Sequence, residues 1–289
     1  MPARLDVAVI GTGRVGSVLG AALKRAGHKI VACTAISDIS KLRAESLLPG
    51  VPIKSLTEAV RDCDLILLTV PDDVLSELVR GLALAGAVSP GTFVVHTAGR
   101  YGDEVLDPLT AIGCLPLALH PVMTFTGTSV DLNRLNACPF GITTPDQLRP
   151  VAQALVVEMG ADPIWVPRES RALYHAALSF GANNVMTLVN QTVDLLAGAG
   201  IEQPTDLIAP LFSAALDNAL RDGDQSMTGP VIRGDVATVA QHLSVLSSQE
   251  PAVVQSYRAL ARLTASRALE SGQLSAQQAE KLLEVLADD

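Results

Sequence analysis

Residues 7–16 read VAVIGTGRVG, an apolar run that leads directly into glycines at positions 11, 13 and 16. The apolar run predicts a buried strand, and residues 17–23 after it predict a helix. Glycines at this spacing permit a tight turn, let bare backbone approach a pyrophosphate and allow the helix to pack closely on the strand. The first amides of that helix would bind the pyrophosphate. The stretch therefore predicts a dinucleotide-binding turn, and the alternative is a turn of the same fold that binds nothing.

The composition limits the classes of partner. The chain has 289 residues, enough for two domains, and a formal net charge of -9 with only 21 Lys and Arg. This balance argues against nucleic acid and anionic membranes and favours a small-molecule substrate. The four cysteines are scattered, and no secretion signal precedes the first strand, which is typical of a reduced, cytoplasmic protein.

Two long uncharged stretches, residues 82–99 and 172–193, need testing as membrane spans because the mean hydropathy is high at +0.34. The first is broken by Ser89, Pro90 and Gly91, and the second contains a His, three Asn and a Gln. We therefore expect no membrane span. The excess apolar surface predicts a homodimer formed through the second domain, and the alternative is that an Ala-rich composition raises the hydropathy.

Short β-like runs alternate with helical ones in the first half of the chain, which predicts an α/β domain with a doubly wound parallel Rossmann sheet at residues 1–167. The predicted strands are residues 6–10, 30–35, 64–70, 92–97, 115–119, 140–143 and 164–166, and further helices are expected at 75–84, 104–112 and 147–159. From residue 168 to 289 only helical periodicity remains, which predicts an all-α domain for substrate binding and dimerisation. Its expected helices are residues 168–197, 204–220, 236–247, 252–270 and 275–287.

Ligands of such sheets bind beyond the C-terminal ends of the strands, so the segments that follow strands are candidates by position. These segments are residues 11–16, 69–73, 96–99 and 120–125. The expected cofactor-binding residues are Gly11, Thr12, Gly13, Arg14, Val15, Gly16, Ser37, Val70, Pro71, Asp72, Thr97 and Ala98. We expect at least one of Asp72 and Asp73 to serve as the N-cap of the helix that follows it.

The end of the second strand bears on the choice of nicotinamide cofactor. An acid about 20 residues beyond the glycines usually binds the ribose hydroxyl of NAD, but no acid ends this strand. Lys41 and Arg43 lie close enough in sequence to meet a 2′-phosphate. This pattern favours NADP, with NAD as the alternative because of Asp38, although Ser37 and Asp38 also resemble a helix cap.

The helix that opens the second domain carries a polar stripe at helical spacing: His175, Ser179, Asn183, Thr187 and Asn190. A polar face on a buried helix requires polar partners, which would be either substrate and nicotinamide or another helix. No lysine occurs between Lys54 and Lys281, which argues against Schiff-base chemistry. His175 or His120 would then titrate near neutral pH and donate the proton in a carbonyl reduction. The alternative for both is a structural role.

A polar loop between later helices offers further substrate contacts. Thr228 lies in this loop, and Arg233 would bind a substrate carboxylate in bidentate fashion, unless it pairs with Asp235. Asp235 is expected to cap the helix that starts at residue 236. Together with Ser179, Thr228 and Arg233 are the expected substrate-binding residues. No metal site is expected, because the histidines lie far apart and carboxylates do not cluster.

The combined motifs are similar to those of a known family. They are residues 11–16, Val70-Pro71-Asp72-Asp73, His96-Thr97-Ala98-Gly99, Leu119-His120-Pro121, Tyr174-His175 with Asn183, and residues 228–235. The chain resembles Rossmann-like proteins with a poorly characterised helical C-terminal domain, within the superfamily of 6-phosphogluconate dehydrogenase, pyrroline-5-carboxylate reductase and ketopantoate reductase. Where related hydroxyacid dehydrogenases carry a Lys-x-x-x-Asn pair, this chain has Ser179 and Asn183.

The resemblance implies an NADP-dependent oxidoreductase that reduces a small carboxylate-bearing ketone, as ketopantoate reductase does. Asn183 would position the carbonyl or the nicotinamide amide, and His175 would replace the missing lysine as the acid. Because an iminium already carries its proton, the missing lysine hinders imine reduction less, so a pyrroline-carboxylate-type imine reductase is the first alternative. A sensor or scaffold that binds a dinucleotide without catalysis is the second.

Overall fold

The computed structural model describes residues 4–287 and consists of two compact units with the boundary after Gly181. The helix α8 (Arg171–Gly198) contains this boundary and is continuous through it. The two units are described separately below. Within the described residues, no helix is long and apolar enough to cross a bilayer.

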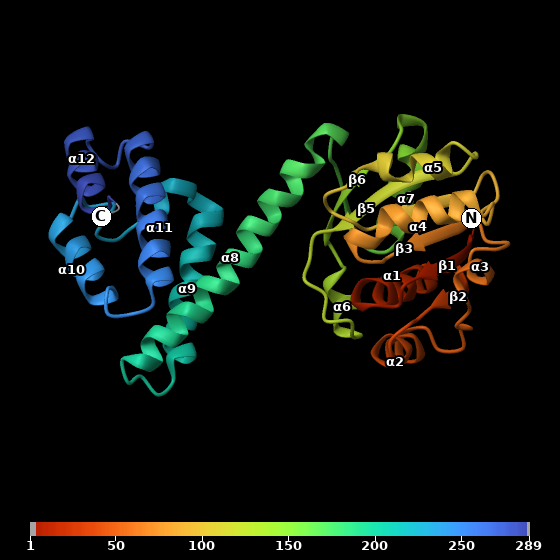
Figure 1. The fold of residues 1–289 in the computed structure, drawn as a ribbon, viewed down its shortest axis with the longest axis horizontal. Coiled ribbons are helices and arrows are strands. Elements are labelled where there is room, and N and C mark those ends of the chain that lie inside the picture. The colour runs from red at the N-terminus through yellow and green to blue at the C-terminus, as the bar shows by residue number, and fades with distance from the viewer. Residues whose placement is uncertain (1–3, 288–289) are drawn as a thin grey trace. The chain divides into compact units, whose positions relative to one another are not determined.

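The N-terminal unit is built on one seven-stranded sheet with the order β2-β1-β3-β4-β5-β6-β7 (Figure 1). The strands are β1 (Asp6–Ile10), β2 (Lys29–Thr34), β3 (Leu65–Leu68), β4 (Phe93–His96), β5 (Leu115–Pro121), β6 (Pro139–Thr143) and β7 (Asp162–Trp165). All seven predicted strands are present, and the predicted α/β class is confirmed. The chain order reverses between β1 and β3, which is the point where ligands bind in doubly wound sheets.

One pair of strands departs from the parallel arrangement that we expected: β6 runs antiparallel to β5, whereas the other neighbours are parallel. The reason is the connection between them. Residues 122–138 contain only the short helix α6 (Val130–Arg134), and Val122 donates a backbone hydrogen bond to Pro139. A connection that stays at one edge of a sheet returns the chain in the opposite direction. His120 is therefore paired with Gly141 of β6.

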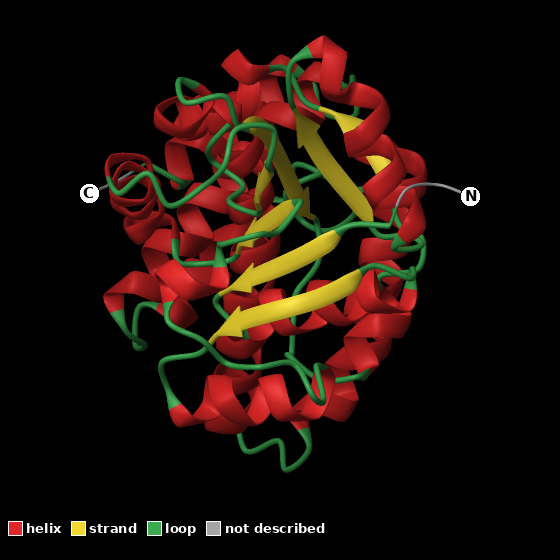
Figure 2. Ribbon diagram, turned by 90° about the vertical axis from the view of Figure 1, so that its right-hand side faces the viewer, coloured by secondary structure: helices red, strands yellow, loops and turns green. Residues whose placement is uncertain are grey.

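Helices lie on both faces of the sheet (Figure 2). They are α1 (Arg14–Arg25), α2 (Asp38–Leu47), α3 (Leu56–Ala59), α4 (Asp72–Leu84), α5 (Asp107–Thr110), α6 and α7 (Arg149–Glu158), with 3-10 turns η1 (Asp103–Leu106), η2 (Asp146–Leu148) and η3 (Arg168–Ser170). Side chains of β1 alternate between two apolar cores. Val7 and Val9 join the core under α1 and α7, and Ala8 and Ile10 join the core under α4 and α5.

Two local predictions are corrected by the structure. Neither Asp72 nor Asp73 is an N-cap: Pro71 occupies that position, and both acids lie in the first turn of α4. The helix expected at residues 104–112 is divided into η1 and α5, with Pro108 in the first turn of α5. By contrast, the Ser37 side chain accepts a hydrogen bond from the Ser40 amide and caps α2 as expected.

The C-terminal unit is helical, as predicted. After α8 it contains α9 (Pro204–Asp222), η4 (Gly223–Ser226), α10 (Val236–Leu246), α11 (Pro251–Glu270) and α12 (Ala276–Val285). Its core is formed by α10, α11 and α12 around Val239, Ala265 and Leu282, none of which is exposed. Asp235 caps α10 as predicted, because its carboxylate accepts hydrogen bonds from the amide and hydroxyl of Thr238.

Candidate active site at the C-terminal ends of the strands

The turn after β1 has the geometry that its glycines predict. Gly11 has φ +95, a conformation that L side chains rarely adopt. A Cβ at Gly16 would lie 2.1 Å from both the Gly11 carbonyl oxygen and the Thr69 hydroxyl, so only glycine lets α1 pack this closely. A Cβ at Gly13 would meet no atom within 4 Å. The first and third glycines therefore serve the fold, whereas the second leaves an open face on the turn.

This open face has the features of an anion-binding helix terminus. Gly13 is the N-cap of α1, no side chain caps the helix, and its first turn contains no acid. The free amides and the helix dipole favour a negative group there. A pyrophosphate fits these donors because nothing on the described chain fills the space over Gly13. Residues 11–16 are therefore suited to hold the phosphates of a dinucleotide.

The turn is held in register with the end of β2. Thr12 is fully buried, and its hydroxyl lies 3.1 Å from the Thr34 carbonyl and 3.0 Å from the Ser40 carbonyl. The Gly11 amide donates to the Thr34 hydroxyl at 2.9 Å. These bonds fix the start of α2 beside the glycine-rich turn, where the adenosine ribose binds in Rossmann folds.

Basic side chains gather at this point. Lys41 pairs with the exposed Asp38 at 3.1 Å. The guanidinium groups of Arg14 and Arg43 make no ion pair within the described residues, and a Cβ at Gly127 would lie 2.7 Å from Arg43 Nε and 3.1 Å from Arg14 Cα. The loop containing Gly127 thus packs beside both arginines.

The loops after β3 and β4 are linked to each other. Arg100 forms an ion pair with the Asp72 carboxylate at 3.5 Å and donates to the Asp72 carbonyl at 3.3 Å. His96 is fully buried; it accepts from the Ala98 amide at Nδ1 and donates from Nε2 to the Gly102 carbonyl. Burial lowers the pKa of His96 to about 4, so it stays neutral and shapes the loop that carries Thr97 and Ala98.

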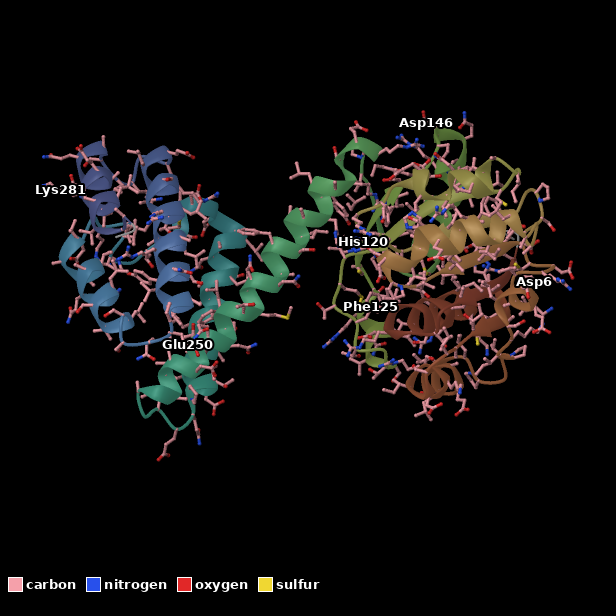
Figure 3. The ribbon with its side chains drawn as sticks, viewed as in Figure 1. Asp6, His120, Phe125, Asp146, Glu250 and Lys281 are labelled. Carbon is pink, nitrogen blue, oxygen red and sulfur yellow. The ribbon has the colours of Figure 1, made fainter. Side chains whose placement is uncertain are left out.

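Three aromatic side chains meet where β5 ends. His120 Nδ1 lies 2.8 Å from the Tyr174 hydroxyl, and the His175 ring lies edge-on to His120 with centroids 6.0 Å apart. His120 lies at the edge of the N-terminal unit (Figure 3). A Cβ at Gly99 would lie 2.4 Å from His175 and 2.9 Å from His120 Nε2, so Gly99 leaves room for both rings. The two histidines chosen from the sequence are therefore neighbours.

The protonation state of His120 differs from our expectation. The pKa of His120 is lowered to about 4, mainly by burial and next by the positive charge of Arg171. His120 is thus neutral near pH 7, and the expectation that it titrates near neutral pH is corrected. His175 is partly exposed and makes no hydrogen bond with the described residues.

Beneath these rings lies a buried cation. Arg171 is 1% exposed, and its guanidinium donates to the Thr143 hydroxyl at 2.7 Å and to carbonyls of Gly99, Ala118 and Gly141 at 2.9 to 3.4 Å. Within the described chain no carboxylate lies within 4 Å of it. The nearby Asp103 carboxylate is bound in bidentate fashion by Arg168 at 2.7 and 2.9 Å. Arg171 thus supplies a positive charge that its hydrogen-bond partners do not neutralise.

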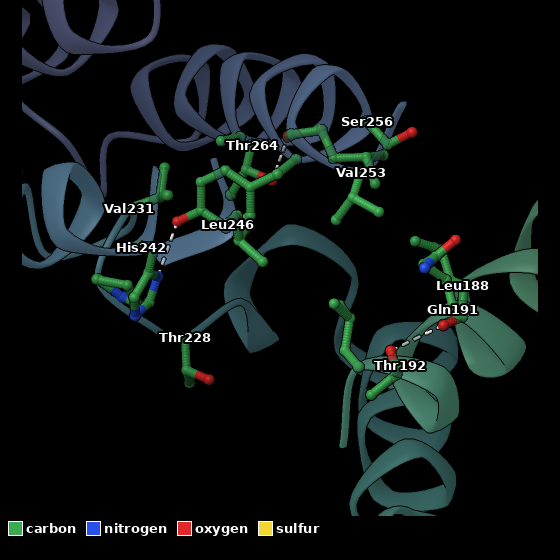
Figure 4. A pocket seen from close by; sticks show the side chains of 15 residues that line it. Leu188, Gln191, Thr192, Thr228, Val231, His242, Leu246, Val253, Ser256 and Thr264 are labelled. Atoms are coloured by element: carbon green, nitrogen blue, oxygen red, sulfur yellow. Dashed lines mark hydrogen bonds between the residues drawn. The ribbon is translucent and has the colours of Figure 1, made fainter. Parts of the chain in front are cut away.

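The remaining predicted site residues lie on α8 and in the helical unit. In the single chain, Ser179 is partly exposed and Asn183 is exposed on α8. Arg233 is exposed. Thr228 lines a cavity of about 400 Å³ in the helical unit, between α8, α10 and α11 (Figure 4). His242 also lines it and lies 2.9 Å from the Tyr257 hydroxyl.

Sequence reasoning gave no role to Arg171 or to the hydroxyl of Tyr174. The signal for Arg171 was weak, since a single arginine before an uncharged helix resembles a solvated helix start. The glycine at position 141 is a clearer sequence signal for the place of the Tyr174 hydroxyl. A Cβ at Gly141 would lie 2.3 Å from that hydroxyl. No cluster of three or more metal-binding side chains occurs among residues 4–287.

The sheet, its reversal point and the glycine-rich turn define a Rossmann-like protein, and the family model described as "Rossmann-like domain" matches residues 1–121. A second family model, "Domain of unknown function (DUF2520)", matches residues 138–264. The chain therefore combines a Rossmann-like domain with a DUF2520 domain. No curated protein matches the sequence.

Solved structures of other proteins share the fold. A candidate NADP oxidoreductase from Bacteroides fragilis is 23% identical with a TM-score of 0.76, and the match covers 91% of this chain and 98% of that one. An imine reductase from Streptomyces aurantiacus is 17% identical with a TM-score of 0.67, covering 92% and 99%. Pyrroline carboxylate reductase from Plasmodium falciparum, with NADP bound, is 12% identical with a TM-score of 0.57, covering 93% and 97%. At these identities the likeness establishes the fold.

Proposed function

We propose that the protein is an NADP-dependent reductase of a small carboxylate-bearing ketone, and that ketopantoate is the first substrate to test. The observation that carries the proposal is the turn at Gly11, Gly13 and Gly16: two of its glycines serve packing, and the third is open at an uncapped helix N-terminus. The packing of the turn does not require a glycine at position 13. The close approach of a pyrophosphate to the backbone does require one.

The preference for NADP over NAD rests on Arg14 and Arg43. Arg14 begins α1 and Arg43 lies within α2; both lie beside Gly127, and neither is engaged in an ion pair with the described residues. A guanidinium binds a phosphate through charge-assisted hydrogen bonds, which are stronger than neutral ones. Asp38, the residue that would favour NAD, is already paired with Lys41.

The reaction requires a hydride and a proton. The reduced nicotinamide would supply the hydride, and the chain's own residues would bind, orient and protonate the substrate. His120 and His175 are the candidate donors because their rings are neighbours at the ends of β4 and β5. Asn183 is proposed to orient the carbonyl or the nicotinamide amide, and Ser179, Thr228 and Arg233 to contact the substrate.

Reduction of an imine is the second candidate, because His120 is held neutral by burial and by Arg171. A substrate that arrives protonated, as an iminium does, needs no acid. Activity that survives His175→Ala and His120→Gln would support this alternative.

Binding and turnover are tested in that order. Purified protein is titrated with NADPH and with NADH, following fluorescence and thermal stability; ligand at 100 times its Kd should add about 2.7 kcal/mol of stability. A panel of keto acids and cyclic imines then follows NADPH oxidation. Tight NADPH binding with turnover of ketopantoate supports the proposal. Binding without turnover on the whole panel would favour a sensor or scaffold, and no binding of either dinucleotide would refute the assignment.

A homodimer formed through the helical domain is part of the proposal. Leu173, Phe180 and Met186 of α8 are 75%, 64% and 50% exposed in the single chain. Large apolar side chains that are exposed in the single chain would be buried in a subunit interface. Light scattering at several protein concentrations tests this, and a monomer at all of them would contradict it.

A further inference from the structure

The contacts of His120 identify which of the two neighbouring histidines is equipped to deliver a proton. His120 Nδ1 lies 2.8 Å from the Tyr174 hydroxyl. His120 Nε2 has no hydrogen-bond partner among the described residues. The atom is not fully buried, so solvent reaches it. His175 has no group within hydrogen-bond distance that would fix its tautomer. Of His120 and His175, it is His120 that has one nitrogen hydrogen-bonded to a proton source and the other free to meet a ligand.

A buried cation lies near Tyr174 and would stabilise the phenolate that remains when the proton of Tyr174 passes to His120. The guanidinium carbon of Arg171 lies 5.5 Å from the centre of the Tyr174 ring, and all four of its hydrogen-bond acceptors are neutral oxygens. A positive charge in a buried environment stabilises a phenolate and opposes protonation of the imidazole. Burial raises the pKa of Tyr174, and Arg171 counteracts that rise.

We propose that Tyr174 and His120 form a proton relay, in which neutral His120 passes a proton from Nε2 to the substrate while it takes one from Tyr174 at Nδ1. The buried Arg171 guanidinium stabilises the tyrosinate that this transfer leaves behind. The inference rests on the proposed function, and it names the proton donor of that site.

A dinucleotide held at Gly11, Gly13 and Gly16 would supply a hydride to the carbonyl carbon, and the C=O π electrons would move to oxygen. That oxygen takes the Nε2 proton of His120, which yields the alcohol. The phenolic proton of Tyr174 moves to Nδ1. To reset the site, a solvent proton enters at Nε2 and the Nδ1 proton returns to Tyr174. In this scheme His120 is a catalytic residue, whereas Tyr174 and Arg171 act through it.

The chain contains a matched control for this pair. His242 and Tyr257 have the same geometry, with Nδ1 and the hydroxyl 2.9 Å apart and ring centroids 5.8 Å apart, compared with 5.6 Å for His120 and Tyr174. Burial alone raises the pKa of Tyr257, whereas Arg171 counteracts burial at Tyr174. The control therefore has the hydrogen bond without the cation.

The first experiment is nitrogen NMR of the five imidazoles in the 289-residue chain without substrate. We expect neutral His120 with its proton on Nε2 across neutral pH. The substitution Tyr174→Phe should shift His120 toward a mixture of tautomers, and Tyr257→Phe should change His242 and leave His120 unaltered. A His120 that carries its proton on Nδ1, or both protons, at pH 7 would overturn the relay whatever the protein reduces.

The second experiment measures turnover with the substrate found above. Tyr174→Phe should lower kcat by about 100-fold, within the usual range for general acid catalysis, while the Kd for NADPH stays near the wild-type value. Arg171→Lys keeps a charge in the cluster and should retain more activity than Arg171→Met. In Arg171→Met, Tyr174 should ionise at a higher pH in an absorbance titration. Unchanged kcat and pH profile in Tyr174→Phe would refute the relay, whereas failure of NADPH binding in the wild type refutes the proposed function.

Discussion

Alanine substitutions at two glycines of one turn should have opposite consequences. In Gly16→Ala the new Cβ would lie 2.1 Å from the Gly11 carbonyl oxygen and the Thr69 hydroxyl, more than an ångström closer than ordinary contact. The Thr69 side chain can rotate, but the Gly11 carbonyl cannot move without the end of β1. Overpacking of this kind costs about 1–3 kcal/mol, and the backbone contact places this case near about 3 kcal/mol. We expect the melting temperature to fall by about 6–12 °C.

Gly13→Ala is the matched control. Gly13 has φ -70 and ψ -161, which alanine tolerates, and its Cβ would meet no protein atom. The loss of a good N-cap residue and the gain from a stiffer unfolded chain roughly offset each other, so stability should change by less than about 1 kcal/mol. A methyl group on the open face of the turn should instead weaken NADPH binding by at least about tenfold, or about 1.4 kcal/mol.

Thermal unfolding without ligand and fluorescence titration with NADPH separate the two effects. Wild-type NADPH affinity in Gly13→Ala would show that the open face of the turn does not receive a pyrophosphate. A wild-type melting temperature in Gly16→Ala would refute the packing argument for the third glycine.

Three further outcomes follow from the site. Arg43→Ala should weaken NADPH binding by about tenfold with little effect on NADH binding. Lys41→Ala should weaken NADPH binding less, because the Lys41 ammonium is already paired with Asp38. Equal losses for both dinucleotides would refute a 2′-phosphate contact. Asn183→Ala should lower kcat more than NADPH affinity, and the reverse pattern would refute its proposed role. His96 and His120 are neutral in the folded state with pKa values of about 4, against 6.5 when unconstrained. The unfolded chain therefore binds more protons as pH falls, so the free energy of unfolding should decrease between pH 6.5 and 4 by up to about 1.4 kcal/mol per pH unit for each histidine. Urea titrations should show this slope, reduced by about half in His120→Gln, and a flat profile would refute it.

The fold could be predicted to a large extent because its signals are local. The apolar run before Gly11 and the turn residues between strands gave every strand of the sheet. The direction of β6 could not be predicted in the same way. It depends on the path of the connection between β5 and β6, which remains at one edge of the sheet. The cap assignment failed at Asp72 because Pro71 takes the cap position itself, with φ -55 and ψ 148.

The candidate site was predictable in part. Positions at the ends of strands pointed to the glycine-rich turn and to His120, which lies in the last residues of β5. The hydrogen bond between His120 and Tyr174 joins residues 54 positions apart. It depends on the pairing of His120 with Gly141, which has no side chain to displace the phenol. Such long-range packing has no periodic signature in the sequence, and neither does the burial of Arg171 among carbonyls.

The site also crosses the boundary between the two family matches. His120 lies at the end of the Rossmann-like match, residues 1–121, whereas Tyr174 and Arg171 lie in the DUF2520 match, residues 138–264, together with β6 and β7. Neither segment alone contains the pair or completes the sheet. A gene fusion or recombination event that exchanged one segment for a distant counterpart would thus bring together halves of the site that had not evolved with each other. His120 and Tyr174 should consequently be inherited, and lost, as a unit.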